Sequence, residues 1–193
     1  MAKHEAGGGE ANKDADGLVI QKYTSMVLVV VPPAEFAEQT LRHARSSLYN
    51  VHVGTYSVST NAKDLIKGRL QDEFMADGDI SGAKMDGYSG VVFVGGEGAL
   101  QLFDNADAQR LAREAGDQKK MIGAWGHAVG ILAKAGILKG RRVTGAPEIA
   151  ELLIQNGAKY SGRQLERDGD LVTAADEAVG IRFGKTLAQI VGI

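Results

Sequence analysis

Two glycine-bearing turns are the parts of this sequence with the clearest capacity for chemistry. The first is Gly95-Gly96-Glu97-Gly98, after the apolar run 91–94, and the second is Gly126-His127, after the apolar run 121–125. Glycines between a strand and a helix let backbone N–H groups face a cleft, where they bind an anion or a carbonyl oxygen. His127 is the one histidine placed to act there as a general base. The plainer alternatives are a tight turn for the glycine loop and a histidine that caps or packs its helix.

Other kinds of catalytic or binding motif receive little support. A dinucleotide-binding G-x-G-x-x-G read from Gly96 fails because its last position is Gln101, and neither G-x-x-x-x-G-K-[ST] nor G-x-S-x-G occurs. The chain has no cysteine, which removes thiol nucleophiles, disulfides and thiolate metal sites together. Its four histidines show no spacing of two to four residues, so the sequence predicts no metal site and no cofactor.

Three acids are candidates to lie near His127. Glu35 and Glu38 follow the first predicted strand, and Glu97 belongs to the glycine loop. A carboxylate beside His127 would tune its protonation or act as a general base. The alternative is that these glutamates are simply solvated.

The composition favours one soluble domain with an ordinary surface. Twenty-two basic residues against 24 acidic ones give a net charge of -2, so nothing favours nucleic acid as a partner. Residues 1–22 are polar and lack the apolar stretch of a signal peptide, and the run 26–31 is too short to span a membrane. We therefore expect a flexible extension over 1–22, a domain over 23–193, and a cytoplasmic protein that does not enter a membrane.

The apolar pattern alternates between strands and helices. Continuous runs predict buried strands at 26–31, 51–56, 90–94, 120–124 and 141–144. Helical spacing predicts helices at 34–48, 105–116, 127–135, 146–155 and 177–191. Residues 57–86 carry a weak pattern that suggests a short helix and irregular or hairpin structure, and Asp168-Gly169 suggests a hairpin over 163–173. The result is an α/β sandwich of three layers around a mainly parallel sheet, with sites at the carboxyl ends of the strands.

These residues resemble the ThiJ/PfpI superfamily, also called the DJ-one family, which is related to class I glutamine amidotransferase domains. The resemblance runs from about residue 25 to the C-terminus and is carried by the segments 86–88 (DGY), 91–99 (VVFVGGEGA), 122–145 (IGAWGHAVGILAKAGILKGRRVTG), 157–158 (GA) and 168–174 (DGDLVTA). It implies a flavodoxin-like sandwich and a homo-oligomer, most simply a dimer. Activities described in the family include peptidase or amidase, glyoxalase, deglycase and isonitrile hydratase, alongside chaperone or stress roles.

The sequence departs from the family at its reactive residues. Most members carry a cysteine at a nucleophile elbow, and the matching position here is Gly126; the family's glutamate after the first strand matches Thr40. The family's oxyanion donors are backbone N–H groups that match Gly96 and His127, and backbone donors survive a change of side chain. Glycine also adopts the strained elbow conformation easily. Trp125 replaces a smaller residue, where it either walls the pocket or belongs to the core, and Val94 replaces a proline.

The resemblance therefore implies a pocket formed by Gly95, Gly96, Glu97, Trp125, Gly126, His127 and Thr40, without thiol chemistry. The leading interpretation is a non-catalytic protein that binds a small carbonyl or carboxylate ligand, or a stress or regulatory protein. One alternative is a cysteine-independent hydrolase or lyase in which His127 and a nearby glutamate activate water. Another is an assembly subunit whose pocket is vestigial.

Overall fold

The computed structural model describes residues 23–192 and contains one seven-stranded sheet. Its strands, in spatial order, are β10 (Leu165–Asp168), β11 (Leu171–Ala174), β7 (Met121–Trp125), β6 (Gly90–Phe93), β1 (Ser25–Val30), β2 (Val53–Ser59) and β5 (Gly78–Asp79). Only β10 is antiparallel to its neighbour in this sheet; the other pairs are parallel. Two small sheets, β3 (Ile66–Lys67) with β4 (Glu73–Phe74) and β8 (Arg142–Val143) with β9 (Lys159–Tyr160), flank it.

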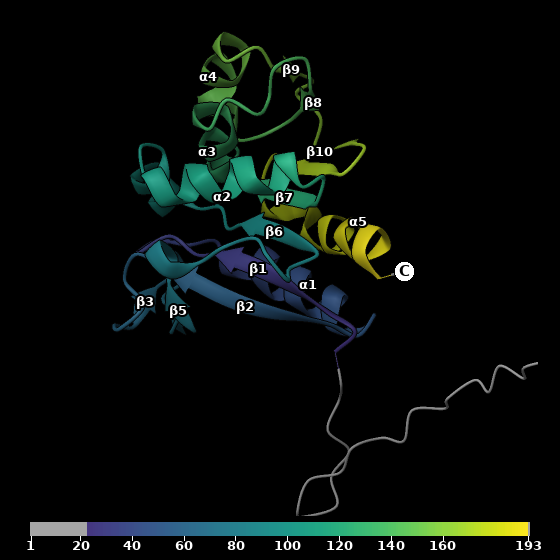
Figure 1. Cartoon of the computed structure of the whole chain (residues 1–193). Coiled ribbons are helices and arrows are strands. Elements are labelled where there is room, and N and C mark those ends of the chain that lie inside the picture. The colour runs from purple at the N-terminus through teal and green to yellow at the C-terminus, as the bar shows by residue number, and fades with distance from the viewer. Residues whose placement is uncertain (1–22, 193) are drawn as a thin grey trace, which may run out of the picture.

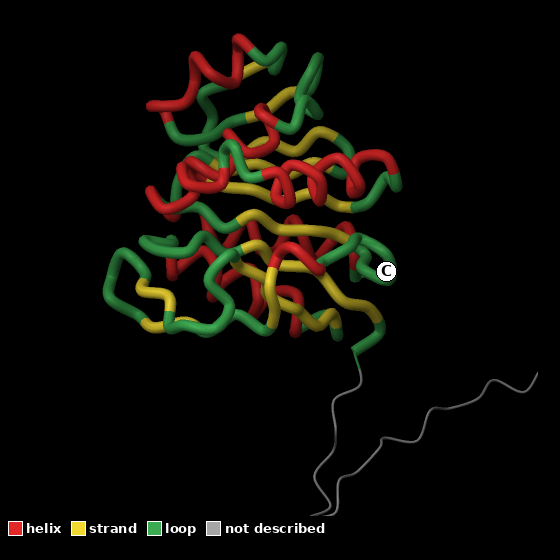
Figure 2. Tube along the Cα trace, turned by 60° about the vertical axis from the view of Figure 1, so that its left-hand side comes forward, coloured by secondary structure: helices red, strands yellow, loops and turns green. Residues whose placement is uncertain are grey.

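Helices cover both faces of the sheet, as Figures 1 and 2 show. On one face α1 (Glu38–Tyr49) and α5 (Gly180–Val191) pack on Val27, Val29 and Val92. On the other, α2 (Ala106–Asp117), α3 (Val129–Lys134) and α4 (Ala150–Gln155) pack on a core that includes Leu28 and Val30. Alternate residues of β1 thus enter opposite cores, because successive strand side chains point to opposite faces.

Helices α1 and α5 approach closely through two glycines. A Cβ at Gly184 would lie 2.6 Å from the carbonyl oxygen of His43, and one at Gly180 would lie 2.9 Å from Oγ1 of Thr40. Both separations are shorter than real Cβ contacts, so the absence of side chains here lets the two helices meet.

The order of elements predicted from the sequence is confirmed, with shifts at the boundaries. Helix α1 begins at Glu38 rather than 34, because Glu35 adopts a φ of +48° and Phe36 forms a bridge with Gly68. The weak region 57–86 holds the hairpin β3–β4, strand β5 and a 3-10 helix η1 (Ile80–Gly82). The predicted helices at 127–135, 146–155 and 177–191 each begin with 3-10 turns, η3 (Gly126–Ala128), η4 (Pro147–Ile149) and η5 (Glu177–Val179).

The parallel strands end at one edge of the sheet and bring distant segments together there. Phe93 pairs with Ala124, and Ala174 pairs with Trp125, so β6, β7 and β11 finish side by side. The loops that follow them begin at residues 94, 126 and 175. The expected extension over residues 1–22 lies outside the described residues. Within residues 23–192, no helix has both the length and the apolar character to cross a membrane.

Candidate functional site

Gly126 forms a sharp elbow directly after β7. Its φ is +58°, the left-handed region that glycine enters without steric cost. Among residues 23–192, apart from Gly126 and its chain neighbours, the nearest atoms to a Cβ built on Gly126 are the Ala175 carbonyl oxygen at 3.8 Å and the Gly96 nitrogen at 4.0 Å. The elbow therefore has room for a side chain and carries none.

The Gly95-Gly96 turn lies against this elbow, and neither of its glycines has room for a side chain. Gly96 has a φ of +107°, and a Cβ there would lie 2.2 Å from the Glu35 carbonyl oxygen. A Cβ at Gly95 would lie 2.4 Å from the Trp125 carbonyl oxygen. The backbone is thus drawn tightly together, and within residues 23–192 the Gly96 N–H has no hydrogen-bond acceptor. His127 lies in the first turn of η3, where N–H groups have no partner within the helix.

Gly96, Gly126 and His127 from these two turns line a pocket of about 270 Å³, whereas Gly95 is not part of its lining. Its floor consists of the buried residues Gly96, Trp125 and Gly126, and the half-buried His127 lies beside them. Side chains from several loops complete the lining, which comprises Ala37, Arg69, Gly96, Glu97, Trp125, Gly126, His127, Ala146, Pro147, Glu148, Ala175, Asp176 and Glu177. Glycine N–H groups and charged side chains therefore share one small cavity.

Trp125 lines the pocket and also belongs to the core. The side chain is fully buried and meets Phe183 edge to face, with ring centroids 5.4 Å apart. Its indole N–H has no acceptor within the described part of the chain. The two roles considered for Trp125 in the sequence, pocket wall and core residue, coexist.

Thr40 reaches this region through its backbone rather than its side chain. The carboxylate of Glu177 accepts hydrogen bonds from the backbone N–H groups of Gln39 at 2.9 Å and Thr40 at 3.2 Å. Glu177 thereby caps α1 at its positive end, as a carboxylate is expected to do. Oγ1 of Thr40 is buried without a hydrogen-bond partner among residues 23–192, and Thr40 is not part of the pocket lining.

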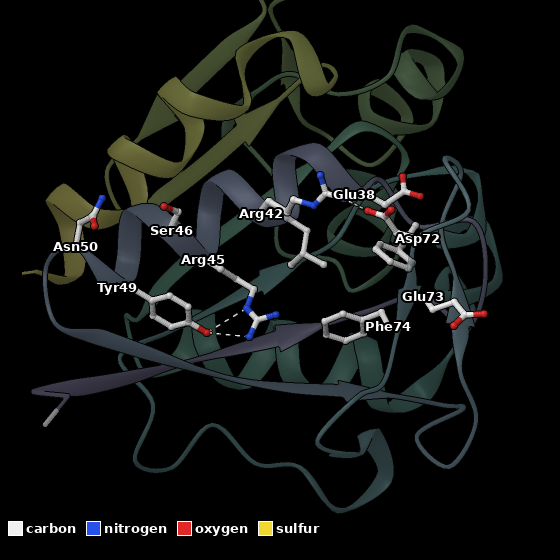
Figure 3. A pocket seen from close by; sticks show the side chains of 11 residues that line it. Glu38, Arg42, Arg45, Ser46, Tyr49, Asn50, Asp72, Glu73 and Phe74 are labelled. Carbon is white, nitrogen blue, oxygen red and sulfur yellow. Dashed lines mark hydrogen bonds and ion pairs between the residues drawn. The ribbon is translucent and has the colours of Figure 1, made fainter. Parts of the chain in front are cut away.

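Of the three acids expected near His127, only Glu97 lines the same pocket. Glu38 is buried, accepts the N–H of Leu70 at 2.5 Å, and lines a separate pocket of about 540 Å³ between α1 and the β3–β4 hairpin. Figure 3 shows this second pocket, in which the Arg45 guanidinium lies between the Tyr49 and Phe74 rings. Glu35 is exposed and contributes its backbone carbonyl oxygen to the packing around Gly96.

Four charged residues of the pocket were missed by the sequence reasoning. Arg69 follows β3, Glu148 belongs to η4, and Asp176 and Glu177 follow β11. The structure explains the position of the last two: β11 is the parallel neighbour of β7, so the segment that follows β11 lies at the same edge of the sheet. Arg69, in a loop, and Glu148, in η4, come from segments whose placement only the folded chain shows.

The segment 141–145 positions one wall of the pocket. The Thr144 N–H donates to Oγ1 of Thr173 at 2.9 Å, and the Thr144 hydroxyl donates to the Arg163 carbonyl oxygen. Two residues later the Ala146 N–H donates to the Gly126 carbonyl oxygen at 3.2 Å. These bonds hold Ala146, Pro147 and Glu148 over the elbow.

The pocket offers donors at its floor and carboxylates at its mouth. No hydrogen bond or ion pair links His127 to a carboxylate within residues 23–192. The described residues also contain no cluster of three or more His, Asp or Glu side chains arranged to hold a metal ion. The arrangement is suited to hydrogen bonding of a small polar molecule.

Comparison with known proteins supports the resemblance seen in the sequence. A protein-family model described as the DJ-1/PfpI family matches residues 21–190. An uncharacterized protein of Methanocaldococcus jannaschii is 30% identical over 161 residues, which cover 82% of this chain and 78% of that protein. Among solved structures, a ThiJ/PfpI domain protein from Brachyspira murdochii gives a TM-score of 0.81 at 23% identity and covers 88% of this chain and 96% of its own.

Drosophila melanogaster DJ-1beta has the same fold, with a TM-score of 0.77 at 21% identity over 88% of this chain and 91% of that chain. The flavodoxin-like α/β architecture is therefore shared with these structures. Since the family match spans nearly all described residues, this chain belongs to the DJ-1/PfpI family.

Proposed function

We propose that this protein binds a small carbonyl compound in the elbow pocket and performs no cysteine-dependent catalysis. The observation that carries the proposal is the empty space above Gly126, with the Gly96 nitrogen 4.0 Å from the point that a Cβ would occupy. A carbonyl oxygen bound in the cavity above the elbow, within about 3 Å of both nitrogens, would accept hydrogen bonds from the N–H groups of Gly96 and His127. Since the chain has no cysteine, such a ligand would be held without a covalent bond to sulfur.

The alternative enzymatic role, activation of water by His127, has less support. A general base of this kind is normally oriented by a hydrogen bond to a carboxylate. Within residues 23–192 no such bond to His127 is present, and Glu38 lies in the other pocket. The assembly-subunit alternative expects a closed cleft, and a pocket of about 270 Å³ counts against it.

Amide NMR shifts test the binding proposal directly. Titration with acetamide, a neutral probe with one carbonyl group, is expected to shift the Gly96 and His127 amide signals saturably. Gly126→Ala is expected to weaken this binding, because the added methyl group enters the space above the elbow. Gly136→Ala is the matched control: Gly136 also has a positive φ, of +80°, with open space around it, and it does not line the pocket.

Turnover measurements test the absence of catalysis. The purified protein is expected to convert neither methylglyoxal nor peptide substrates above the buffer rate. Saturable turnover that disappears in His127→Ala would overturn the non-catalytic part of the proposal. Acetamide binding that is absent, or unchanged in Gly126→Ala, would overturn the binding part.

Two broader expectations belong to this proposal, a cytoplasmic location and a homodimer. The dimer is supported by exposed apolar side chains around the β3–β4 hairpin, namely Leu65, Leu70 and Met75, which are 53%, 59% and 58% exposed. Apolar side chains gathered on one surface often mark a protein contact. A monomer in sedimentation velocity at micromolar concentration would contradict the dimer.

A further inference from the structure

The charges around the elbow pocket are unequal. Four carboxylates line it, those of Glu97, Glu148, Asp176 and Glu177, against the single guanidinium of Arg69. None of these five side chains takes part in an ion pair within residues 23–192. The pocket therefore combines uncompensated negative charge with the donor groups of its floor.

The place where the fold would best hold an anion is already filled. The N-terminus of α1 reaches the pocket at Ala37, and its N–H groups at Gln39 and Thr40 are bound by the Glu177 carboxylate. Helix N-termini attract anions through these same groups. A ligand carboxylate would have to displace Glu177, so the protein's own side chain disfavours anionic ligands.

The remaining carboxylates surround the mouth. Glu97, Glu148 and Asp176 are exposed, and Asp176 accepts one hydrogen bond, from the Ala178 N–H at 2.7 Å. For Glu97 and Glu148 no hydrogen-bond partner is present in the described part of the chain. Two carboxylates at the mouth are thus available to a positively charged group of a ligand.

The floor carries the complementary chemistry. The Gly96 N–H has no acceptor within residues 23–192, and the same is true of the buried indole N–H of Trp125 in the adjoining wall. A ligand that matches both the floor and the mouth of the pocket needs an acceptor oxygen at the floor and a cationic group at the mouth. In a cavity of about 270 Å³ these groups must be only a few bonds apart.

We propose that the ligand of the elbow pocket carries a protonated amine close to its carbonyl group, as an amino amide or an aminoketone does. This inference rests on the proposed carbonyl binding and adds the charge of the ligand. The carbonyl oxygen is held by the floor amides, and the ammonium group lies among Glu97, Glu148 and Asp176. Opposite charges about 4 Å apart attract by about 1 kcal/mol even at the dielectric constant of water.

Three amide probes that differ in charge test the inference. They are glycinamide, a cation at about pH 6.5 where an α-amino group is mostly protonated, neutral acetamide, and anionic malonamate. Each is titrated into the full chain while the Gly96 and His127 amide shifts are followed. Glycinamide is expected to bind about tenfold more tightly than acetamide, and malonamate more weakly than either.

A double substitution separates the binding of the ammonium group at the mouth from the binding of the carbonyl oxygen at the floor. Glu97→Gln with Glu148→Gln is expected to lower the ratio of glycinamide affinity to acetamide affinity several-fold, because two of the three carboxylates near the ammonium group lose their charge. The matched control is Asp86→Asn with Asp117→Asn, which removes the same charge from exposed positions before β6 and before β7, at the opposite edge of the sheet. The control is expected to retain the preference for glycinamide.

The outcomes distinguish this inference from the proposed function. Equal binding of glycinamide and acetamide, tighter binding of malonamate, or an unchanged preference in the Glu97/Glu148 double variant would overturn the charge preference and leave carbonyl binding in place. Failure of all three probes to shift Gly96 and His127 would overturn the proposed function itself, and the charge preference with it. Since the exchanged residues are exposed, the variants are expected to fold normally, which their amide spectra will show.

Discussion

At the scale of single residues, the site depends on Gly96 and Gly126, and these two positions differ in whether the surrounding structure requires a glycine. At Gly96 a side chain would collide with the Glu35 carbonyl oxygen, whereas at Gly126 the surrounding space is open. Packing therefore requires glycine at 96 and does not require it at 126. The empty elbow is a property of this sequence that the fold does not impose.

Stability measurements on two alanine variants should show this difference. Gly126→Ala is expected to lower the free energy of unfolding by about 1 kcal/mol, the cost of a left-handed backbone for a residue with a Cβ. Gly96→Ala is expected to cost about 3 kcal/mol or more, because its Cβ would lie 2.2 Å from a backbone oxygen and the loop would have to move. Urea unfolding of both variants provides the values. Equal losses of unfolding free energy in the two variants would show that the loop at Gly96 shifts to accept a Cβ at little energetic cost.

At the scale of elements, the contact between α1 and α5 fixes the region beside the pocket. Gly180 and Gly184 form one stripe of α5, and α1 lies directly upon it. The same helix α1 presents its first N–H groups to Glu177, which lies just before α5. Helix contact and helix cap therefore work together to hold the N-terminus of α1 at the site.

A methyl group inserted between these helices should be costly. Gly184→Ala would place its Cβ 2.6 Å from the His43 carbonyl oxygen, so we expect a loss of about 1 to 3 kcal/mol, as for other overpacked contacts. Ile181→Ala, on the same helix at a position that is 54% exposed, is the control and should change stability by about 0.5 kcal/mol at most. Thermal or urea unfolding compares the two. A loss in Gly184→Ala no larger than that of the control would mean that α5 moves away without cost.

The elements themselves were largely predictable, because each strand and helix carries its own apolar pattern. The runs 26–31, 90–94 and 120–124 gave β1, β6 and β7 to within one residue at each end. Boundaries set by tertiary contacts could not be predicted from the sequence. Residues 34–37 are not helical, because they lie between Gly68 and the glycine loop. The hairpin at 57–86 was foreseen only loosely, because its two-residue strands are too short to show a period.

At the scale of the whole molecule, an ion network ties the small β8–β9 unit to the edge of the main sheet. The Asp168 carboxylate accepts the Arg142 N–H at 2.8 Å and the Arg141 guanidinium at 3.3 Å. These contacts, with the Arg142 N–H first among them, hold the pKa of Asp168 below its usual value. The lowered pKa makes this junction a pH-dependent source of stability.

Acid weakens the stabilisation that the Asp168 carboxylate provides. Since the pKa of Asp168 is lower in the folded chain, its contribution is present above the ordinary value of about 3.9 and is lost as pH falls through the folded value. Asp168→Asn is expected to cost about 1 kcal/mol at neutral pH, a small figure because the side chain is 35% exposed. Urea unfolding between neutral and acidic pH should show wild type and variant converging below about pH 4. Asp117→Asn, on an exposed residue, is the control, and a constant gap for Asp168→Asn would contradict the assignment.

The site was less predictable than the fold, because the arrangement of the whole sheet decides which residues meet in the pocket. The two glycine turns follow strands whose patterns are strong, so Gly96, Gly126 and His127 were placed from the sequence in the pocket that they line. Glu148 and Glu177 lie at the starts of helices that the sequence did predict, whereas Arg69 and Asp176 lie in loops. These four residues meet only after the sheet has set its strand order. The charge of the pocket is therefore a property of the folded chain.

Trp125 is the single tryptophan of the chain, and the structure places it in the wall of the pocket against Phe183. The tryptophan fluorescence of this protein therefore reports on the pocket wall alone. An indole buried without a hydrogen-bond acceptor among the described residues emits toward shorter wavelengths than one in water. The protein thus contains a built-in optical probe next to its candidate binding site, with no label required to follow what enters there.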